Sequence, residues 1–227
     1  MTPIEVAIFD FDGTVVDSMS FLTRLATDLL VANYGMEREK AGRAYVETTG
    51  LPFEKQVELI FPGDARNRST VEAFEERKRE SLFDFEVFPD APPALERIRR
   101  EGIKVCVSSG NYEDVIAEIV RFRGLEFDLV MGFRPGFQKG PDHFRFAMDT
   151  FGAAPDRVLF VGDSRKDGLA AQEAGIRFIA RTGLLTAEEF SRVLPGVPSI
   201  DSLDEILPFM GIMETDQEQE DTGRETP

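Results

Sequence analysis

The sequence predicts an α/β protein in which helices cover both faces of a parallel sheet and a block of helices is inserted after the first strand. Two observations lead to this fold class. An apolar run at residues 6–9 has the composition of a buried strand, and from residue 88 onward strand-like and helix-like segments alternate. Such alternation is typical of a parallel sheet with helices on both faces. At 227 residues, the chain is long enough to close a large core.

The insert follows the first strand directly. Phe21, Leu25 and Leu29 recur at helical spacing within residues 17–33, and turn residues separate further helical segments. These segments are residues 37–48, 53–61 and 70–83.

The second half of the chain supplies the rest of the sheet. We expect helices at residues 91–101, 112–123, 141–151 and 166–174, and strands at residues 103–108, 129–132, 157–162 and 176–180. The predicted domains are an α/β core (1–15 and 85–211), a helical unit (16–84) and an acidic, disordered tail (212–227).

Composition excludes several classes of function. The net charge of −16 argues against a nucleic-acid surface, because phosphate backbones require clustered Lys and Arg. A single cysteine, Cys106, allows no intrachain disulfide and favours the cytoplasm, and neither a leader nor a membrane span is indicated. The only histidine, His143, leaves no ligand set for zinc, and we expect it on the surface of a helix's first turn.

Polar residues stand where the predicted strands end or the next helix begins. They are Asp10 and Asp12, Ser108 and Ser109, Lys139, and Asp163 with Asp167. Ligands bind at the carboxyl ends of the strands in open sheets of this kind, so these side chains should meet at one edge.

This set of groups suits phosphate chemistry. Carboxylates such as Asp10 and Asp163, with a backbone carbonyl and water, suit Mg²⁺. Ser108 and Lys139 supply donors and positive charge to a phosphate. Two acids held one residue apart can serve as nucleophile and as general acid/base on the same phosphoryl group. Taken singly, each residue has an ordinary explanation: Lys139 could be a solvated lysine, and Asp163 or Asp167 could cap the following helix.

The stretches "DFDGT", Ser108 after "KVCV", Lys139 before a helix, and "VGDSRKD" resemble the four motifs of the haloacid dehalogenase (HAD) superfamily. More narrowly, they resemble its phosphatase branch with a helical cap, which includes phosphoglycolate phosphatases and β-phosphoglucomutases. The resemblance covers residues 4–209. It implies a Rossmann-like core with an inserted cap.

The resemblance also implies a role for each residue. Asp10 would be the nucleophile and Asp12 the general acid/base. Mg²⁺ would be bound by Asp10, the Asp12 carbonyl and Asp163, with Asp167 supporting the metal ligands. Ser108, Ser109 and Lys139 would hold the transferring phosphoryl group.

The cap should select the leaving group. Residues 48–52 resemble the substrate-specificity loop of such caps. We expect the nearby Lys55 and Gln56 to face solvent, and Arg134 to be solvated. Asn111 stands close to where some relatives carry a basic residue.

The sequence therefore predicts a Mg²⁺-dependent phosphatase that hydrolyses a small phosphorylated metabolite through an aspartyl-phosphate on Asp10. The alternatives are a β-phosphoglucomutase-like phosphomutase, or a slow phosphate-binding or regulatory module. We expect no nucleic-acid or membrane partner, and the choice between monomer and homodimer stays open.

Overall fold

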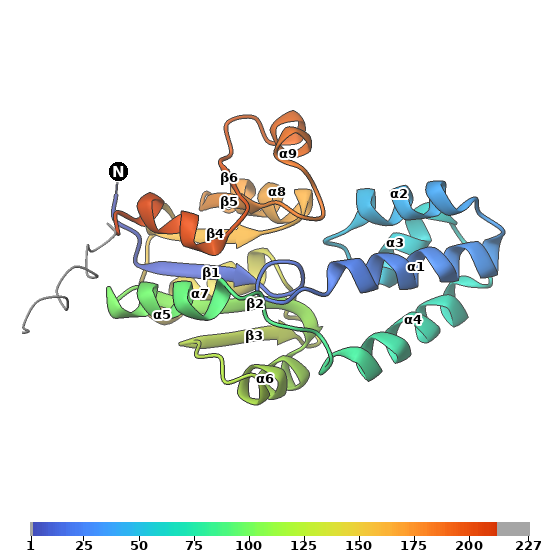
Figure 1. The fold of residues 1–227 in the computed structure, drawn as a ribbon, viewed down its shortest axis with the longest axis horizontal. Helices are drawn as coiled ribbons and strands as arrows, with labels where there is room; N and C mark the ends of the chain where they lie inside the picture. The colour runs from blue at the N-terminus through green and yellow to red at the C-terminus, as the bar shows by residue number, and fades with distance from the viewer. Residues whose placement is uncertain (1, 213–227) are drawn as a thin grey trace, which may run out of the picture.

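A parallel sheet forms the centre of the protein in the computed structural model, which describes residues 2–212 (Figure 1). In this part of the chain the sheet has six strands in the order β3-β2-β1-β4-β5-β6. The strands are β1 (Val6–Asp10), β2 (Lys104–Tyr112), β3 (Leu129–Phe133), β4 (Val158–Gly162), β5 (Arg177–Arg181) and β6 (Ser199–Ile200). The predicted fold class is confirmed.

Side chains of β1 alternate between two buried layers, as a strand's period of two requires. Ala7 and Phe9 pack in one layer, and Val6 and Ile8 in the other. The first layer is closed by α5 (Ala91–Arg100), α6 (Glu113–Phe122) and the 3₁₀ helix η2 (Leu203–Met210). The second is closed by α7 (Pro141–Phe151), α8 (Arg165–Glu173) and α9 (Ala187–Val193), with the short 3₁₀ helix η1 (Pro155–Arg157) leading into β4.

Four helices form a separate cap beside the sheet (Figure 1). They are α1 (Met19–Tyr34), α2 (Arg38–Thr48), α3 (Phe53–Ile60) and α4 (Asn67–Ser81). The cap has its own apolar core, in which Leu30 is fully buried and the rings of Phe53 and Phe74 stack 3.9 Å apart. The predicted helical cap after the first strand is thus confirmed.

The chain enters and leaves the cap along two linkers that run side by side. Asp17 N–H donates to Glu86 O at 2.9 Å, and Phe88 N–H donates to Val15 O at 3.0 Å. These bonds place the two crossings next to each other, and we propose the division into core (1–15, 85–211) and cap (16–84) on this basis.

Arg181, at the end of β5, fastens both linkers to the core. Its guanidinium pairs with Asp90 at 2.9 Å, donates to Thr14 O at 2.9 Å and lies 4.1 Å from the ring centre of Phe88. Burial would raise the pKa of Asp90, but the Leu203 N–H and Arg181 outweigh it and lower that pKa. The base of the cap is therefore held by a buried, charged anchor.

The structure departs from the predicted elements in a few places. β2 runs to Tyr112, four residues past its predicted end, while α9, β6 and η2 were not predicted. Of the predicted acidic tail, Ile212 is buried, and residues 213–227 lie outside the described part of the chain. Within residues 2–212, no helix combines the length and apolar character needed to cross a bilayer.

Candidate active site

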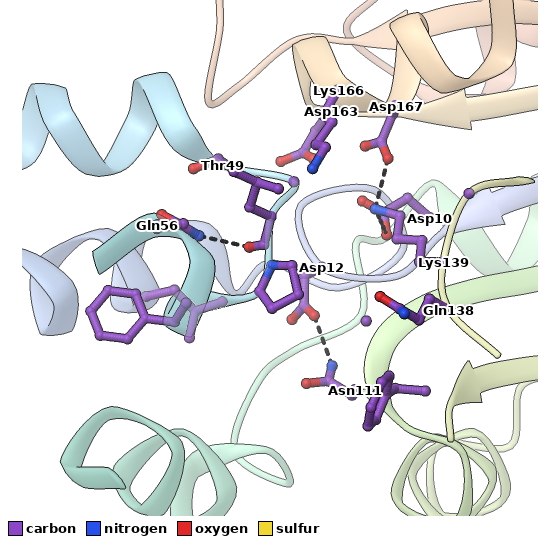
Figure 2. A pocket seen from close by; sticks show the side chains of 18 of the residues that line it. Asp10, Asp12, Thr49, Gln56, Asn111, Gln138, Lys139, Asp163, Lys166 and Asp167 are labelled. Carbon is purple, nitrogen blue, oxygen red and sulfur yellow. Dashed lines mark hydrogen bonds and ion pairs between the residues drawn. The ribbon is translucent and has the colours of Figure 1, made fainter. Parts of the chain in front are cut away.

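The carboxyl edge of the sheet and the underside of the cap enclose a cavity of about 490 Å³ (Figure 2). Core residues at the ends of β1, β2 and β4 line one side of it, and residues of α1 to α4 line the other. A cavity of this size accommodates a small molecule. The polar groups predicted from the sequence meet here, with two exceptions described below.

Asp10 ends β1 and is only 4% exposed. Its Oδ1 accepts the Phe11 N–H at 2.7 Å. The chain then turns at Gly13, whose φ of +76° favours glycine. A Cβ at position 13 would lie 2.1 Å from Asp163 Oδ2, so only glycine lets the turn pass so close to the acids.

Lys139 joins two of the carboxylates. Its Nζ lies 2.8 Å from Asp10 Oδ1 and 2.8 Å from Asp167 Oδ1 (Figure 2). Burial disfavours the ammonium, but these two carboxylates outweigh it and raise the pKa of Lys139. Asp167 also accepts a hydrogen bond from Ser164 Oγ at 2.7 Å, at the start of α8. Asp167 therefore belongs both to the beginning of a helix and to the site.

Three buried acids, Asp10, Asp163 and Asp167, bring carboxylate oxygens within 4.8 Å of one another. Burial raises the pKa of Asp10 to about 7 despite the nearby Lys139, and burial and the neighbouring acids raise the pKa of Asp163 well above its ordinary value. Within residues 2–212, Asp163 Oδ2 has no hydrogen-bond partner. An unpaired buried carboxylate among like charges fits a hard divalent cation with oxygen ligands.

Asp12 is not part of this cluster, and its carboxylate lies between Asn111 of the core and Lys78 of the cap. Ser18 Oγ donates to Asp12 Oδ1 at 2.7 Å, and Asn111 Nδ2 donates to Asp12 Oδ2 at 2.8 Å (Figure 2). Lys78 Nζ on α4 lies 3.9 Å from the same Oδ2. The two acids of "DFDGT" thus face different partners, as two different roles would require.

Ser108 and Ser109 are fully buried and do not line the cavity. The Ser108 hydroxyl lies 2.9 Å from His143 Nδ1. Ser109 Oγ accepts from the backbone N–H of Asn111 at 3.1 Å and from its side chain at 3.2 Å. Their role in binding phosphate stays a prediction, and the residues of this segment that line the cavity are Gly110, Asn111 and Tyr112.

The expectation that His143 lies on a helix surface is wrong. His143 is in the first turn of α7, as predicted, but is fully buried. Its Nε2 lies 3.2 Å from Gly132 O, which can only accept, so Nε2 carries the proton and Nδ1 accepts from Ser108 Oγ. The ring thereby ties together β2, β3 and α7, the elements that flank Lys139.

This imidazole should stay neutral well into acid. Burial, together with the nearby Lys139, lowers the pKa of His143 from 6.5 to about 4. The unfolded chain takes up the proton near pH 6.5, so the free energy of unfolding should fall between pH 6.5 and 4, by up to about 1.4 kcal/mol per pH unit. NMR titration of the chain's single imidazole measures this directly, and His143→Phe should lack this part of the pH dependence. An imidazole that titrates near pH 6.5 in the folded protein would contradict the assignment.

The cap loop at residues 48–52 lies over the core. Thr49, Gly50, Leu51 and Pro52 line the cavity. A Cβ on Gly50, whose φ is +90°, would lie 2.6 Å from Ser164 Oγ and 2.7 Å from Lys166 Cβ. The loop therefore touches the start of α8 at this glycine.

The residues flanking the loop behave differently from one another. The expectation that Gln56 faces solvent is wrong. Gln56 is buried, donates to Leu51 O at 2.8 Å and accepts from Thr48 Oγ1 at 2.9 Å, and these bonds fix the loop. Lys55 is exposed, as predicted.

Arg134 lies in the core, after β3, and was expected to be solvated. It is exposed, pairs with Glu113 at 3.3 Å and does not line the cavity.

Sequence reasoning assigned no site role to several polar residues that line the cavity, among them Lys78, Asn111 and Lys166. Asn111 carried a signal, because it directly follows the "SSG" that ends the predicted strand. Lys78 carried none, since α4 is rich in exposed charges and only the packed cap shows which of them faces the core.

The chain is similar in sequence to known proteins over most of its length. A family model described as haloacid dehalogenase-like hydrolase matches residues 7–181. Phosphoglycolate phosphatase 1 of Pseudomonas aeruginosa is 29% identical over 219 residues, which cover 89% of this chain and 78% of that protein. A phosphoglycolate phosphatase of Pseudomonas fluorescens is 26% identical over 218 residues, with the same two coverages.

Solved structures show the same architecture. A haloacid dehalogenase-like hydrolase from Bacteroides fragilis superposes with a TM-score of 0.75 at 25% identity, over 89% of this chain and 99% of that one. CbbY from Rhodobacter sphaeroides in complex with phosphate has a TM-score of 0.69 at 22% identity, over 89% and 96% of the two chains. At that identity, CbbY supports the fold alone.

Proposed function

The chain belongs to the haloacid dehalogenase-like hydrolase family, and from this premise we propose that it is a Mg²⁺-dependent phosphatase of a small phosphorylated metabolite that acts through an aspartyl-phosphate on Asp10. One observation carries the proposal. Asp10 contacts Lys139, while Asp12, which Ser18 and Asn111 hold separately, lines the same cavity. This arrangement offers a nucleophile and a proton donor to a single phosphoryl group.

The first step transfers the phosphoryl group. A carboxylate oxygen of Asp10 forms a bond to phosphorus while the bond from phosphorus to the ester oxygen breaks. Asp12 gives its proton to that oxygen, which leaves as an alcohol. Ser18 and Asn111 hold the Asp12 carboxylate in place for this transfer.

The second step releases phosphate. Asp12, now a carboxylate, removes a proton from water, whose oxygen attacks phosphorus and frees the Asp10 carboxylate. Lys139 stays between Asp10 and Asp167 and offsets negative charge on the transferring oxygens. Asp10, Asp163 and the Asp12 carbonyl would hold Mg²⁺, with Asp167 behind them. When bound, the ion neutralises charge on the phosphoryl oxygens.

Phosphate release from a panel of phosphorylated metabolites, with Mg²⁺ and with EDTA, tests the proposal. The panel begins with phosphoglycolate, which the names of two relatives contain. We expect release that requires Mg²⁺. No release from any member by folded, Mg²⁺-loaded protein would contradict it, and isomerised sugar phosphates without net release would indicate a phosphomutase.

The close contact at Gly50 predicts that this residue controls activity. Gly50→Val should push the cap loop away from Ser164 and Lys166, and a displacement of about 1 Å near a reacting group can lower kcat about 100-fold. Gly63→Val is the matched control, because Gly63 is also in the cap with a positive φ of +68° but has nothing within 4 Å of its Cβ position. Equal losses of kcat in the two variants would show that backbone strain, not the contact, is responsible.

A further inference from the structure

An aromatic pair on the core side of the cavity takes no part in the proposed steps. Tyr112 at the end of β2 and Phe133 at the end of β3 both line the cavity, with ring centroids 5.5 Å apart and ring planes at 72°. Tyr112 is 52% exposed although it lies at the cavity. An exposed ring in the wall of a ligand cavity is a surface that an apolar or aromatic group can cover.

The backbone brings these two rings together through a close approach of β2 and β3. The register between the strands shifts before their last pair, Tyr112 with Phe133. A Cβ at Gly132 would lie 2.3 Å from Glu113 Cα and 2.8 Å from Asn111 O. Only glycine therefore lets β3 come so close to the end of β2, and the next residue, Phe133, is thereby held beside Tyr112.

Asn111 places this aromatic pair near the atom where the leaving group begins. Its Nδ2 donates to Asp12 Oδ2 at 2.8 Å (Figure 2), and Asp12 serves the ester oxygen in the proposed steps. Tyr112 follows Asn111 directly, about 3.8 Å along the chain, and Val115 in the first turn of α6 also lines the cavity. A leaving group that starts at Asp12 therefore meets an apolar surface of the core a few atoms beyond the ester oxygen.

The charges around the cavity favour a leaving group that is neutral. Among the described residues that line it, six carboxylates outnumber four cations. The carboxylates are Asp10, Asp12, Glu75, Asp163, Asp167 and Glu173, and the cations are Lys78, Arg79, Lys139 and Lys166. Bound Mg²⁺ brings this set to neutrality. Even with Asp12 protonated, as the first step requires, the phosphoryl dianion outweighs the one remaining positive charge, so a second anion on the substrate would find no free cation.

The size of the cavity allows a ring beside the phosphoryl group. Its volume of about 490 Å³ is within the range of cavities that hold drug-sized ligands. A phosphoryl group with a leaving group of one or two carbons would leave the aromatic wall uncovered.

We propose that Tyr112 and Phe133 form a subsite for a neutral aromatic or heteroaromatic ring on the leaving group, so that the preferred substrates are phosphate monoesters of alcohols that carry such a ring one or two atoms from the ester oxygen. This inference rests on the proposed function. It goes further by assigning two specificity residues, on the core and not on the cap, and the chemical class of the substrate.

Three esters that share the phosphoryl group and the first carbon test the inference. Benzyl phosphate carries a phenyl ring on that carbon, cyclohexylmethyl phosphate a saturated ring, and ethyl phosphate a methyl group. The measurement is kcat/KM for each ester in the Mg²⁺-loaded wild-type protein and in Tyr112→Ala. The chemical reactivity of each ester is the same with both proteins, so a change in their ratio reports on the subsite.

The preference for benzyl over ethyl phosphate should fall about 3- to 10-fold in Tyr112→Ala, as expected for the loss of one aromatic contact. Tyr112→Phe keeps the ring and should keep the preference. The preference for cyclohexylmethyl phosphate should fall less than that for benzyl phosphate. Because the leaving group is expected to be neutral, kcat/KM for phosphoglycolate should be below that for benzyl phosphate.

Phe122→Ala supplies the matched control. Phe122 is the last residue of α6, is 64% exposed and meets Phe83 edge to face at the same centroid distance of 5.5 Å, but it does not line the cavity. Its removal should leave the preference unchanged. Thermal unfolding shows whether both variants are folded.

Several outcomes would overturn the inference. Equal losses for benzyl and ethyl phosphate in Tyr112→Ala would show that Tyr112 acts through Asn111 and Asp12, and an unchanged preference would show that the ring of the substrate lies elsewhere. An equal fall for the saturated ring would contradict an aromatic subsite, and a higher kcat/KM for phosphoglycolate would contradict a neutral leaving group. Release of phosphate from none of these esters, nor from any other member of the panel, by the wild-type protein would overturn the proposed function itself.

Discussion

Asp10→Asn is expected to lower phosphate release by at least about 10⁴-fold, the range seen when a group essential to covalent catalysis is removed. The amide oxygen can still accept the Phe11 N–H, but the side chain is no longer a nucleophile. The variant should fold at least as stably as the wild type in EDTA, because it removes one negative charge from the cluster with Asp163 and Asp167.

The measurement is steady-state phosphate release with Mg²⁺, together with thermal unfolding to show that the variant is folded. Asp17→Asn is a suitable control, since Asp17 is exposed and does not line the cavity. If folded Asp10→Asn kept more than about one hundredth of the activity, Asp10 would not be the nucleophile.

Lys139→Met should cause the largest loss of stability. It removes the cation paired with Asp10 and Asp167 and leaves three buried acids facing one another. Breaking a buried pair in this way costs about 3–5 kcal/mol of unfolding free energy. The loss should grow as the pH rises, because the pKa values of Asp10 and Asp163 are already raised and these two acids avoid repulsion only while protonated.

Mg²⁺ should raise the free energy of unfolding of both proteins. The increase should be larger for Lys139→Met, because the bound cation replaces part of the positive charge that Lys139 supplied. Denaturant unfolding with EDTA and with Mg²⁺ measures both effects. Lys104→Met is the control: Lys104 is about half exposed, pairs with Asp128, and should contribute at most about 1 kcal/mol. If Lys139→Met does not fold, Lys139→Arg keeps the charge and should keep the stability. A smaller response to Mg²⁺ in the Met variant than in the wild type would contradict a cation site at these acids.

The sequence predicted what depends on local pattern and strand order. Asp10, Lys139, Asp163 and Asp167 could be identified because each stands at the end of a strand or the start of a helix, and parallel strands bring such ends together. β6 has only two residues, too few for an alternating pattern to be visible.

The burial of His143 could not be predicted, for a different physical reason. A polar residue on the inner face of a helix is acceptable only where hydrogen bonds satisfy it. Its partners, Ser108 and Gly132, come from two other strands. The position of Lys78 at the cavity could not be predicted either, because only the packing of α4 brings its Nζ to 3.9 Å from Asp12 Oδ2.

The paired linkers have a consequence for how such a protein can change over generations. Residues 15–17 and 86–88 lie side by side, and Arg181 binds this part of the chain to the core. The inserted segment that forms the cap therefore leaves and rejoins the core at one place. The ends could be joined by a short turn without rethreading the sheet, which is the condition under which inserted units are tolerated. Recombination at two adjacent positions could therefore replace one cap with another, and a lineage could acquire a new substrate while inheriting its catalytic acids intact.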